Sequence, residues 1–163
     1  MNDKSPFIVD ADWLAEHLND PGVSIVDASW YLPAQQRDAK QEYQAGHIPG
    51  AVFFDQDLVV EPGSTLPHTL PRPSVFAQHA GSMGITSDDT IVVYDGPGLF
   101  SAPRVWWMFR VMGAAEVFVL DGGFDGWANY EMCSPIRGGG AAENLDGYAR
   151  HYVRWMPANV LRP

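Results

Sequence analysis

The chain has 163 residues, of which 46% are hydrophobic, and it carries 20 acidic against 10 basic side chains, a formal net charge of −10. This length fits one domain with a sizeable core, and this apolar content excludes a chain that is disordered throughout. The negative charge disfavours nucleic acid and membrane surfaces as partners, and the one cysteine excludes an internal disulfide framework and a cysteine-rich zinc site.

No segment approaches the ~18 apolar residues that cross a bilayer, and the first residues lack the apolar core of a secretory leader. We therefore expect a cytoplasmic protein. The histidines have neither helical i, i+4 spacing nor cysteine neighbours, so we expect no metal site and no bound cofactor.

Strands and helices alternate along the chain. Trp13, Leu14 and Leu18 share one helical face behind Asp10, which is a favourable N-cap residue. In chain order, the first half of the sequence predicts an apolar run at 7–9, a helix that follows Asp10, a strand at 23–26, a helix at 37–45 and a strand at 51–54.

A long loop separates the two halves of the pattern. Residues 55–72 are rich in proline and polar side chains, and loops of this length are often functional. In chain order, the second half predicts a helix at 74–83 with Pro73 at its first position, a strand at 91–94, a loop at 95–101, a helix at 102–112, a strand at 117–120 and a short helix that carries Phe124 and Trp127.

This alternation implies an α/β domain with a mainly parallel sheet. We place the domain at residues 1–137 and interpret residues 138–163, which are first rich in glycine and then irregular, as a linker or tail. Ligands of such sheets gather at the carboxyl ends of the strands. Four acids follow predicted strands at that edge: Asp27, Asp55, Asp95 and Asp121.

The loop at 95–101 leaves a strand and opens a helix, an arrangement that suits an anion or a nucleophile. It contains no cysteine, lysine or histidine, so the scaffold of a catalytic loop is present without the nucleophile. Asp95, Gly96 and Gly98 fit a tight turn in which glycine permits positive φ and the acid caps or pairs locally. An alternative is a dinucleotide-binding loop, although its third small position would be Ser101.

Three other residue groups have structural explanations. We expect Arg104 to pair with a strand-end acid, Asp27 or Asp95, with a clamp on a substrate carboxylate as the alternative. The apolar helix at 102–112 is expected to be buried all round, with part of it available to a domain interface. Cys133 has no nearby lysine and is expected to be a small, partly buried apolar residue.

Several motifs together resemble a known family. They are YQAGHIPGAVFFD (43–55), LPHTLP (66–71), GLFSAPRVWWMFR (98–110) and DGGFDGW (121–127). Over residues 7–135 the chain resembles the N-terminal half of two-domain rhodanese-like sulfurtransferases, most like those that use 3-mercaptopyruvate or thiosulfate. DASWYLP (27–33) and RDA (37–39) fit the same subgroup.

The resemblance implies a rhodanese-like domain, with a central, mainly parallel five-stranded sheet and helices on both faces. In that family a C-terminal domain carries a cysteine, which takes sulfur as a persulfide and passes it to a thiol or cyanide, whereas the N-terminal domain lacks it. Asp95 stands at the equivalent position here. We therefore expect a structural, cleft-forming half, inactive alone, whose partners are a C-terminal rhodanese domain and a small sulfur donor.

The resemblance also implies site residues. Asp57 and His68 match positions thought to support a proton relay with a serine of the other domain; from the residues alone they fit a solvated loop acid and a loop histidine. Phe100, Ser101 and Arg104 would line the substrate cleft. His47 resembles a structural position that ties a turn together.

Other functions remain open at this point. The chain could be a stand-alone, non-catalytic rhodanese-like module that binds or regulates a partner, a nucleotide-dependent enzyme, or a small sulfurtransferase that uses Cys133. An exposed interface would also allow the fragment to dimerise. The sequence does not distinguish thiosulfate from 3-mercaptopyruvate.

Overall fold

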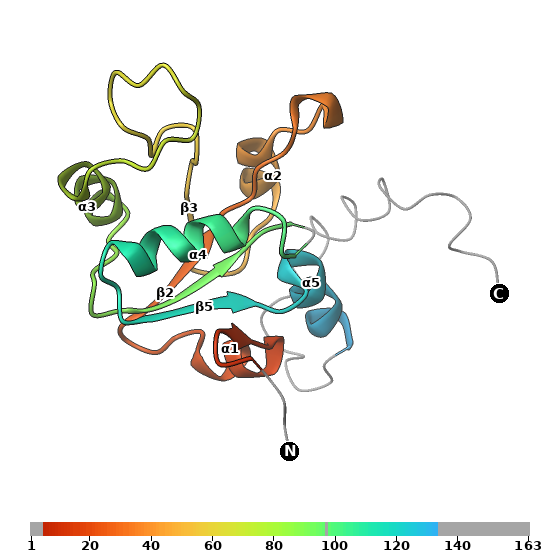
Figure 1. Cartoon of the computed structure of the whole chain (residues 1–163). Helices are drawn as coiled ribbons and strands as arrows, with labels where there is room; N and C mark the ends of the chain where they lie inside the picture. The colour runs from red at the N-terminus through yellow and green to blue at the C-terminus, as the bar shows by residue number, and fades with distance from the viewer. Residues whose placement is uncertain (1–4, 97, 134–163) are drawn as a thin grey trace.

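Five parallel strands form the centre of the domain (Figure 1). The computed structural model describes residues 5–96 and 98–133. Its strands lie side by side in the order β1, β5, β4, β2, β3. Their bounds are β1 Ile8–Val9, β2 Val23–Asp27, β3 Val52–Phe53, β4 Thr90–Tyr94 and β5 Glu116–Leu120.

The three central strands are apolar almost throughout because both faces of the sheet are covered. Val26 of β2 stands beside Val93 of β4, which stands beside Val119 of β5, and all three belong to one core cluster. Ile25 and Val92, one residue earlier on their strands, belong to the cluster on the opposite face. The register therefore divides each strand between two cores.

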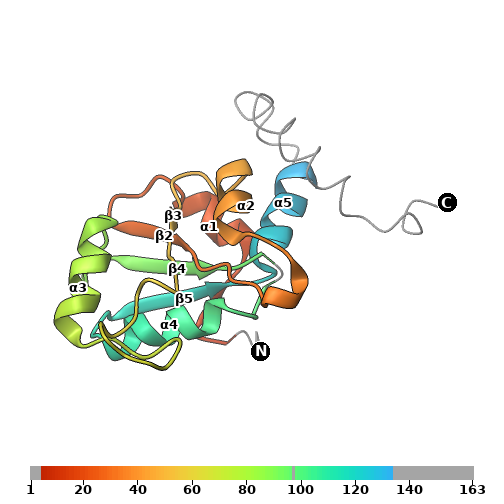
Figure 2. The same cartoon turned by 90° about the horizontal axis from the view of Figure 1, so that it is seen from above.

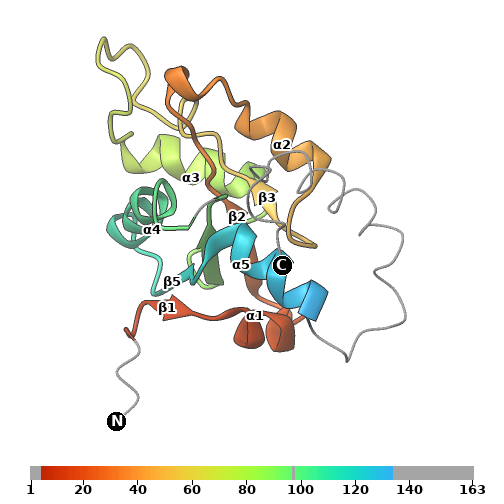
Figure 3. The same cartoon turned by 90° about the vertical axis from the view of Figure 1, so that its right-hand side faces the viewer.

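Helices cover both faces of the sheet (Figure 3). One face carries α3 (Pro73–Ser82) and α4 (Ala102–Val111), and the other carries α1 (Ala11–His17), α2 (Ala39–Ala45) and α5 (Gly123–Cys133). The predicted fold class, a five-stranded parallel sheet with helices on both faces, is confirmed.

Side-chain caps explain where two helices begin. The carboxylate of Asp10 accepts a hydrogen bond from the Trp13 backbone nitrogen at 2.9 Å, as the sequence predicts for α1. The carboxylate of Asp38 accepts one from the Gln41 nitrogen at 2.9 Å, so α2 begins at Ala39 and not at residue 37. A short 3-10 helix, η1 (Pro33–Gln35), which the sequence did not predict, fills the segment between β2 and α2.

The loop between β3 and α3 is the longest connection of the described chain, and it lies at the edge of the domain above α3 and α4 (Figures 1 and 2). Arg72 closes its far end, donating to the Glu61 carboxylate from its backbone nitrogen and from Nε, each at 2.8 Å. The loop is thus anchored although it contains no helix or strand.

One expectation about α4 is wrong. The helix is not buried all round, because the side chains of Trp107 and Val111 are 42% and 51% exposed. Val105, Met108 and Phe109 form its buried face against the sheet.

No described helix is long and apolar enough to cross a membrane. The predicted linker at 138–163 lies outside the described residues.

Candidate functional site

Acidic residues gather at the carboxyl edge of the sheet, as the sequence predicts. β2 ends at Asp27, while Asp95 and Asp121 directly follow β4 and β5, and Asp55 follows β3 by one further residue. Their environments differ. Asp27 and Asp95 are 4% and 0% exposed, whereas Asp121 lies in solvent.

The carboxylate of Asp95 caps helix α4, although Asp95 lies seven residues before the first residue of the helix. Its Oδ2 accepts hydrogen bonds from the backbone nitrogens of Phe100, Ser101 and Ala102 at 2.8, 2.6 and 2.8 Å. Ser101, the residue at the N-cap position itself, makes no side-chain cap. The expected anion-binding strand–loop–helix is therefore present, and its anion is a carboxylate of the chain itself.

Close packing explains the glycines of this loop. Gly98 has φ +79°, and a Cβ there would lie 3.0 Å from the Gly122 carbonyl carbon. A Cβ on Gly123 would clash with the Asp95 carbonyl oxygen, and one on Gly96 would lie 2.6 Å from the Tyr31 hydroxyl. The loop is wedged between neighbouring backbone and Tyr31. This packing supports the tight-turn explanation over dinucleotide binding, which needs open space above the glycines.

A hydrogen-bonded cluster covers Gly96. The Tyr31 hydroxyl donates to Glu42 Oε2 at 2.8 Å and accepts from Arg37 Nη2 at 2.8 Å, while Arg37 Nε donates to Glu42 Oε1 at 2.8 Å. The Arg37 guanidinium also stacks 3.7 Å from the centre of the Tyr31 ring. Burial and the Glu42 carboxylate raise the pKa of Tyr31 far above its ordinary range, so the phenol stays neutral.

The sequence analysis assigned no role to this cluster, although its residues lie within or beside the motifs DASWYLP and RDA. Local spacing could not indicate this cluster. Tyr31 lies on one side of the 3-10 helix, its partners lie on the other, and Gly96 belongs to a different loop. The contact follows from the side-by-side placement of β2 and β4.

Asp57 and His68, predicted from the resemblance, lie together in the long loop. His68 Nδ1 lies 3.5 Å from Asp57 Oδ1, and the two atoms do not form a hydrogen bond. Trp30 joins them: its indole nitrogen donates to both carboxylate oxygens of Asp57 at 3.3 and 3.2 Å, and its ring stands edge-on to His68 at 5.1 Å. The sequence did not indicate Trp30 as a site residue.

The predicted partner of Arg104 is wrong. Asp95 is committed to the backbone of α4, and Arg104 Nη2 instead donates to the backbone carbonyl oxygen of His68. Within the described chain Arg104 contacts no carboxylate, and its Nε is buried without a hydrogen-bond partner. Its alternative role as a clamp for a substrate carboxylate stays a prediction.

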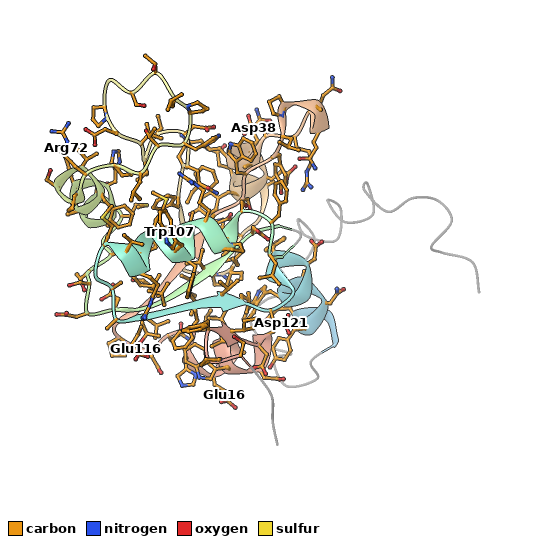
Figure 4. The ribbon with its side chains drawn as sticks, viewed as in Figure 1. Glu16, Asp38, Arg72, Trp107, Glu116 and Asp121 are labelled. Atoms are coloured by element: carbon orange, nitrogen blue, oxygen red, sulfur yellow. The ribbon has the colours of Figure 1, made fainter. Side chains whose placement is uncertain are left out.

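The crest of the loop presents apolar side chains outward. Leu99 and Phe100 are 55% and 51% exposed, whereas Ser101 is buried, with its hydroxyl 3.4 Å from Asp95 Oδ2. On the helix behind the crest, Trp107 lies on the outer side of α4 (Figure 4). The predicted place of Phe100 in a substrate cleft stays a prediction, and within this domain Ser101 packs inward.

A second buried acid supports the sheet edge. The carboxylate of Asp27 accepts from the Ser29 nitrogen at 2.9 Å. Burial raises the pKa of Asp27, and hydrogen bonds from Ser29 and Tyr94 offset part of that rise. Nearby, His47 Nδ1 donates to the Tyr43 carbonyl oxygen at 2.8 Å and its ring stacks on Tyr43, which confirms the structural role expected for His47.

The chemistry available at this edge is limited. A carboxylate fills the anion site, an imidazole–carboxylate pair lies beside it, and the loop from 95 to 101 has no cysteine. Cys133 is the last residue of α5, in a different element. No group of three histidine, cysteine or acidic side chains suited to a metal ion occurs within 5–96 and 98–133.

Comparison with known proteins gives a consistent result. A model of the rhodanese-like domain matches residues 10–130. The chain is 50% identical over 127 residues to 3-mercaptopyruvate sulfurtransferase of Escherichia coli K12, a match that covers 77% of this chain and 45% of that protein. It is 49% identical over 133 residues to thiosulfate/3-mercaptopyruvate sulfurtransferase 1, mitochondrial, of Arabidopsis thaliana, covering 80% and 35%.

The solved structures agree with the sequences. The fold resembles the crystal structure of SseA from E. coli, a protein of the 3-mercaptopyruvate sulfotransferases. The TM-score is 0.74 at 48% sequence identity, and the match covers 78% of this chain and 49% of that one. The chain thus spans less than half the length of these relatives.

Proposed function

Because the chain belongs to the rhodanese-like domain family, we propose that it is the non-catalytic, N-terminal half of a two-domain sulfurtransferase acting on 3-mercaptopyruvate or thiosulfate. Its task is to form one wall of the cleft in which a second rhodanese-like domain carries the reacting cysteine. Sulfur moves from the donor to that cysteine as a persulfide and then to a thiol or cyanide.

The observation that carries this proposal is the position of Asp95. The loop has the strand–loop–helix geometry of an anion site, and the Asp95 carboxylate occupies it with three backbone hydrogen bonds. A carboxylate does not hold a sulfane sulfur, and its negative charge repels anionic sulfur donors. The loop therefore has a stabilising role in this domain, and the nucleophile must come from elsewhere.

Exposed apolar side chains around the loop support a partner domain. Leu99, Phe100, Trp107 and Val111 are each 42% or more exposed, on the crest and on the outer face of α4. Exposed apolar side chains that form a contiguous patch mark protein–protein interaction sites. The relatives' greater length supplies the occupant we propose, a second rhodanese-like domain of the same protein.

The Asp57–His68 pair gives this half a chemical contribution. Asp57 is 64% and His68 31% exposed in their side chains, so both can reach a group that a second domain brings. An imidazole oriented by a carboxylate can move a proton while the carbon–sulfur or sulfur–sulfur bond of the donor breaks. Without that second domain the pair has no reacting partner.

Two measurements test the proposal. The native polypeptide is isolated from its source cells with an antibody to this domain, and its intact mass is measured; we expect about twice the 18.0 kDa of this chain. Thiocyanate formation from cyanide is then assayed with each sulfur donor. We expect activity in the native polypeptide and none in the 163-residue chain.

Other results would overturn the proposal. A native mass of 18.0 kDa would make the chain a stand-alone module with a binding or regulatory role. Thiocyanate formation by the 163-residue chain, abolished in a Cys133→Ser variant, would make it a small enzyme that uses its own thiol.

A further inference from the structure

A hydrogen bond from Arg104 Nη2 to the backbone carbonyl oxygen of His68 connects α4 to the candidate relay histidine. We propose that Arg104 is a positioning residue: by holding the His68 backbone carbonyl, it keeps the His68 imidazole beside Asp57 and Trp30. The importance of this for sulfur transfer rests on the function proposed above, whereas the orientation itself is a property of this domain.

The backbone at His68 needs an external restraint. Its φ is +53°, in the left-handed region that non-glycine residues rarely adopt, at a cost of roughly 1 kcal/mol. Such a conformation persists only when surrounding contacts fix it. The Arg104 guanidinium provides a charge-assisted hydrogen bond to the carbonyl of this residue.

Two further anchors of the loop involve residues on either side of His68. Glu61 accepts from Arg72, and the Glu61 nitrogen donates to the Thr69 hydroxyl at 3.3 Å. These contacts join the loop to itself and to the start of α3. The Arg104 contact ties the His68 backbone to the helix that begins at the Asp95 loop.

The position of Arg104 within its helix points the same way. It is the third residue of α4, where the positive end of the helix dipole disfavours a cation, and the first turn holds no acidic residue. Arg104 makes no ion pair with a described carboxylate. The helix dipole therefore gives no reason for a cation at this position, whereas the hydrogen bond to the His68 carbonyl oxygen does.

A small change at the His68 backbone would spoil the ring geometry. Nδ1 lies 3.5 Å from Asp57 Oδ1, and the imidazole stands at 89° to the Trp30 ring. The separation from Asp57 is already longer than an ordinary hydrogen bond, and the edge-on contact with Trp30 depends on the orientation of the ring. Misplacement of a catalytic group by about 1 Å can lower a rate by roughly 100-fold.

Arg110 offers a matched control. It lies in the last turn of the same helix and also donates to a backbone carbonyl oxygen, that of Ala115, at a site remote in sequence from the long loop. Arg104→Met and Arg110→Met each remove one guanidinium–carbonyl bond from α4. Arg104→Lys retains a cationic donor and serves as the conservative variant.

The first readout is the chemical shift of the His68 ring protons in the 163-residue chain, which the adjacent Trp30 ring displaces. We expect Arg104→Met to lose that displacement, Arg104→Lys to keep part of it, and Arg110→Met to keep it in full, while circular dichroism shows all three folded. Retention of the full displacement in Arg104→Met would overturn the proposal.

A second measurement, made on the unsubstituted chain, tests the proposal even if Arg104→Met does not fold. In the unsubstituted chain, a guanidinium held by the His68 carbonyl rotates slowly and gives resolved Nη proton signals. One averaged signal for Arg104 would overturn the proposal without any variant.

Kinetics of the native polypeptide separate this inference from the proposed function. We expect Arg104→Met to lower kcat at least ~10-fold with KM changed less than ~2-fold, because it disturbs a proton-transfer group and not donor binding. If the unsubstituted polypeptide transfers no sulfur, the proposed function fails, while the NMR result still decides whether Arg104 orients His68.

Discussion

The Oδ2 atom of Asp95 lies 2.6 Å from the backbone nitrogen of Ser101, with two further backbone nitrogens at 2.8 Å. This carboxylate, six residues before Ser101, substitutes for an ordinary N-cap side chain. Asp95 is fully buried, and the hydrogen bonds from Ser101 and Ala102 are buried as well, so these two N–H groups lose their acceptor if the carboxylate is removed. The loop between β4 and α4 is therefore held in its shape by the Asp95 carboxylate.

Replacement of Asp95 should destabilise the domain strongly. We expect Asp95→Ala to lower the free energy of unfolding by about 2–3 kcal/mol, since buried N–H groups lose their acceptor. Asp95→Asn should lose less, because its amide oxygen can still accept. Urea unfolding measures both. The control Asp38→Ala removes an exposed cap with one hydrogen bond and should cost about 1 kcal/mol. Equal losses for Asp95→Ala and Asp38→Ala would contradict the capping role.

The contact between Gly96 and Tyr31 gives a second prediction. A methyl group on Gly96 would lie 2.6 Å from the Tyr31 hydroxyl but 3.7 Å from the ring carbon that bears it. We expect Gly96→Ala to cost about 1–3 kcal/mol through this overlap. In the Tyr31→Phe background, which lacks the hydroxyl, the same substitution should cost clearly less. Urea unfolding of the two single variants and the double variant measures both costs. If the losses in free energy of unfolding are strictly additive, the Tyr31 hydroxyl does not restrict the space at Gly96.

The sequence predicts the strands well for a physical reason. Residues 23–26, 91–94 and 117–120 are apolar runs because they are buried on both faces, and turn residues bound them. The same pattern does not reveal the strand order, which places β4 between β2 and β5. That order brings Tyr31 over Gly96, so the cluster around Tyr31 could not be predicted from local spacing.

The sequence indicated some of the neighbours in the candidate site, and the role of the site stays a prediction. The spacing of Asp57 and His68 indicated the pair through the resemblance, and the structure places them 3.5 Å apart. Trp30 was missed because it meets Asp57 only where the loops after β2 and β3 lie side by side. The predicted ion pair of Arg104 is wrong. Asp95, the nearest acid in sequence, accepts hydrogen bonds from backbone N–H groups, and Arg104 donates to the His68 carbonyl oxygen.

The uneven burial of α4 gives a third prediction. Phe109 is 2% exposed and packs against Phe54 and Phe76, whereas Trp107 is 42% exposed. We expect Phe109→Ala to lower the free energy of unfolding of the 163-residue chain by about 3–5 kcal/mol and Trp107→Ala by about 1 kcal/mol. Thermal and urea unfolding measure both. A loss at Trp107 as large as that at Phe109 would restore the expectation of a helix buried all round.

The buried carboxyl of Asp27 gives a prediction about pH. Burial raises its pKa in the folded chain above the ordinary value of 3.8, although hydrogen bonds from Ser29 and Tyr94 offset part of the rise. Between these two pKa values the folded chain binds more protons at Asp27 than the unfolded chain does. Rising pH therefore lowers the free energy of unfolding through this group.

Asp27→Asn removes the titration and leaves an oxygen to accept from the Ser29 nitrogen. The stability of this variant minus that of the unsubstituted chain should increase as pH rises from about 3.5 and reach a plateau above the folded-state pKa. Urea unfolding at a series of pH values measures the difference, and Asp121→Asn, an exposed acid at the same sheet edge, corrects for the loss of one negative charge. A difference that stays constant or shrinks with rising pH would mean that the folded chain does not retain the Asp27 proton.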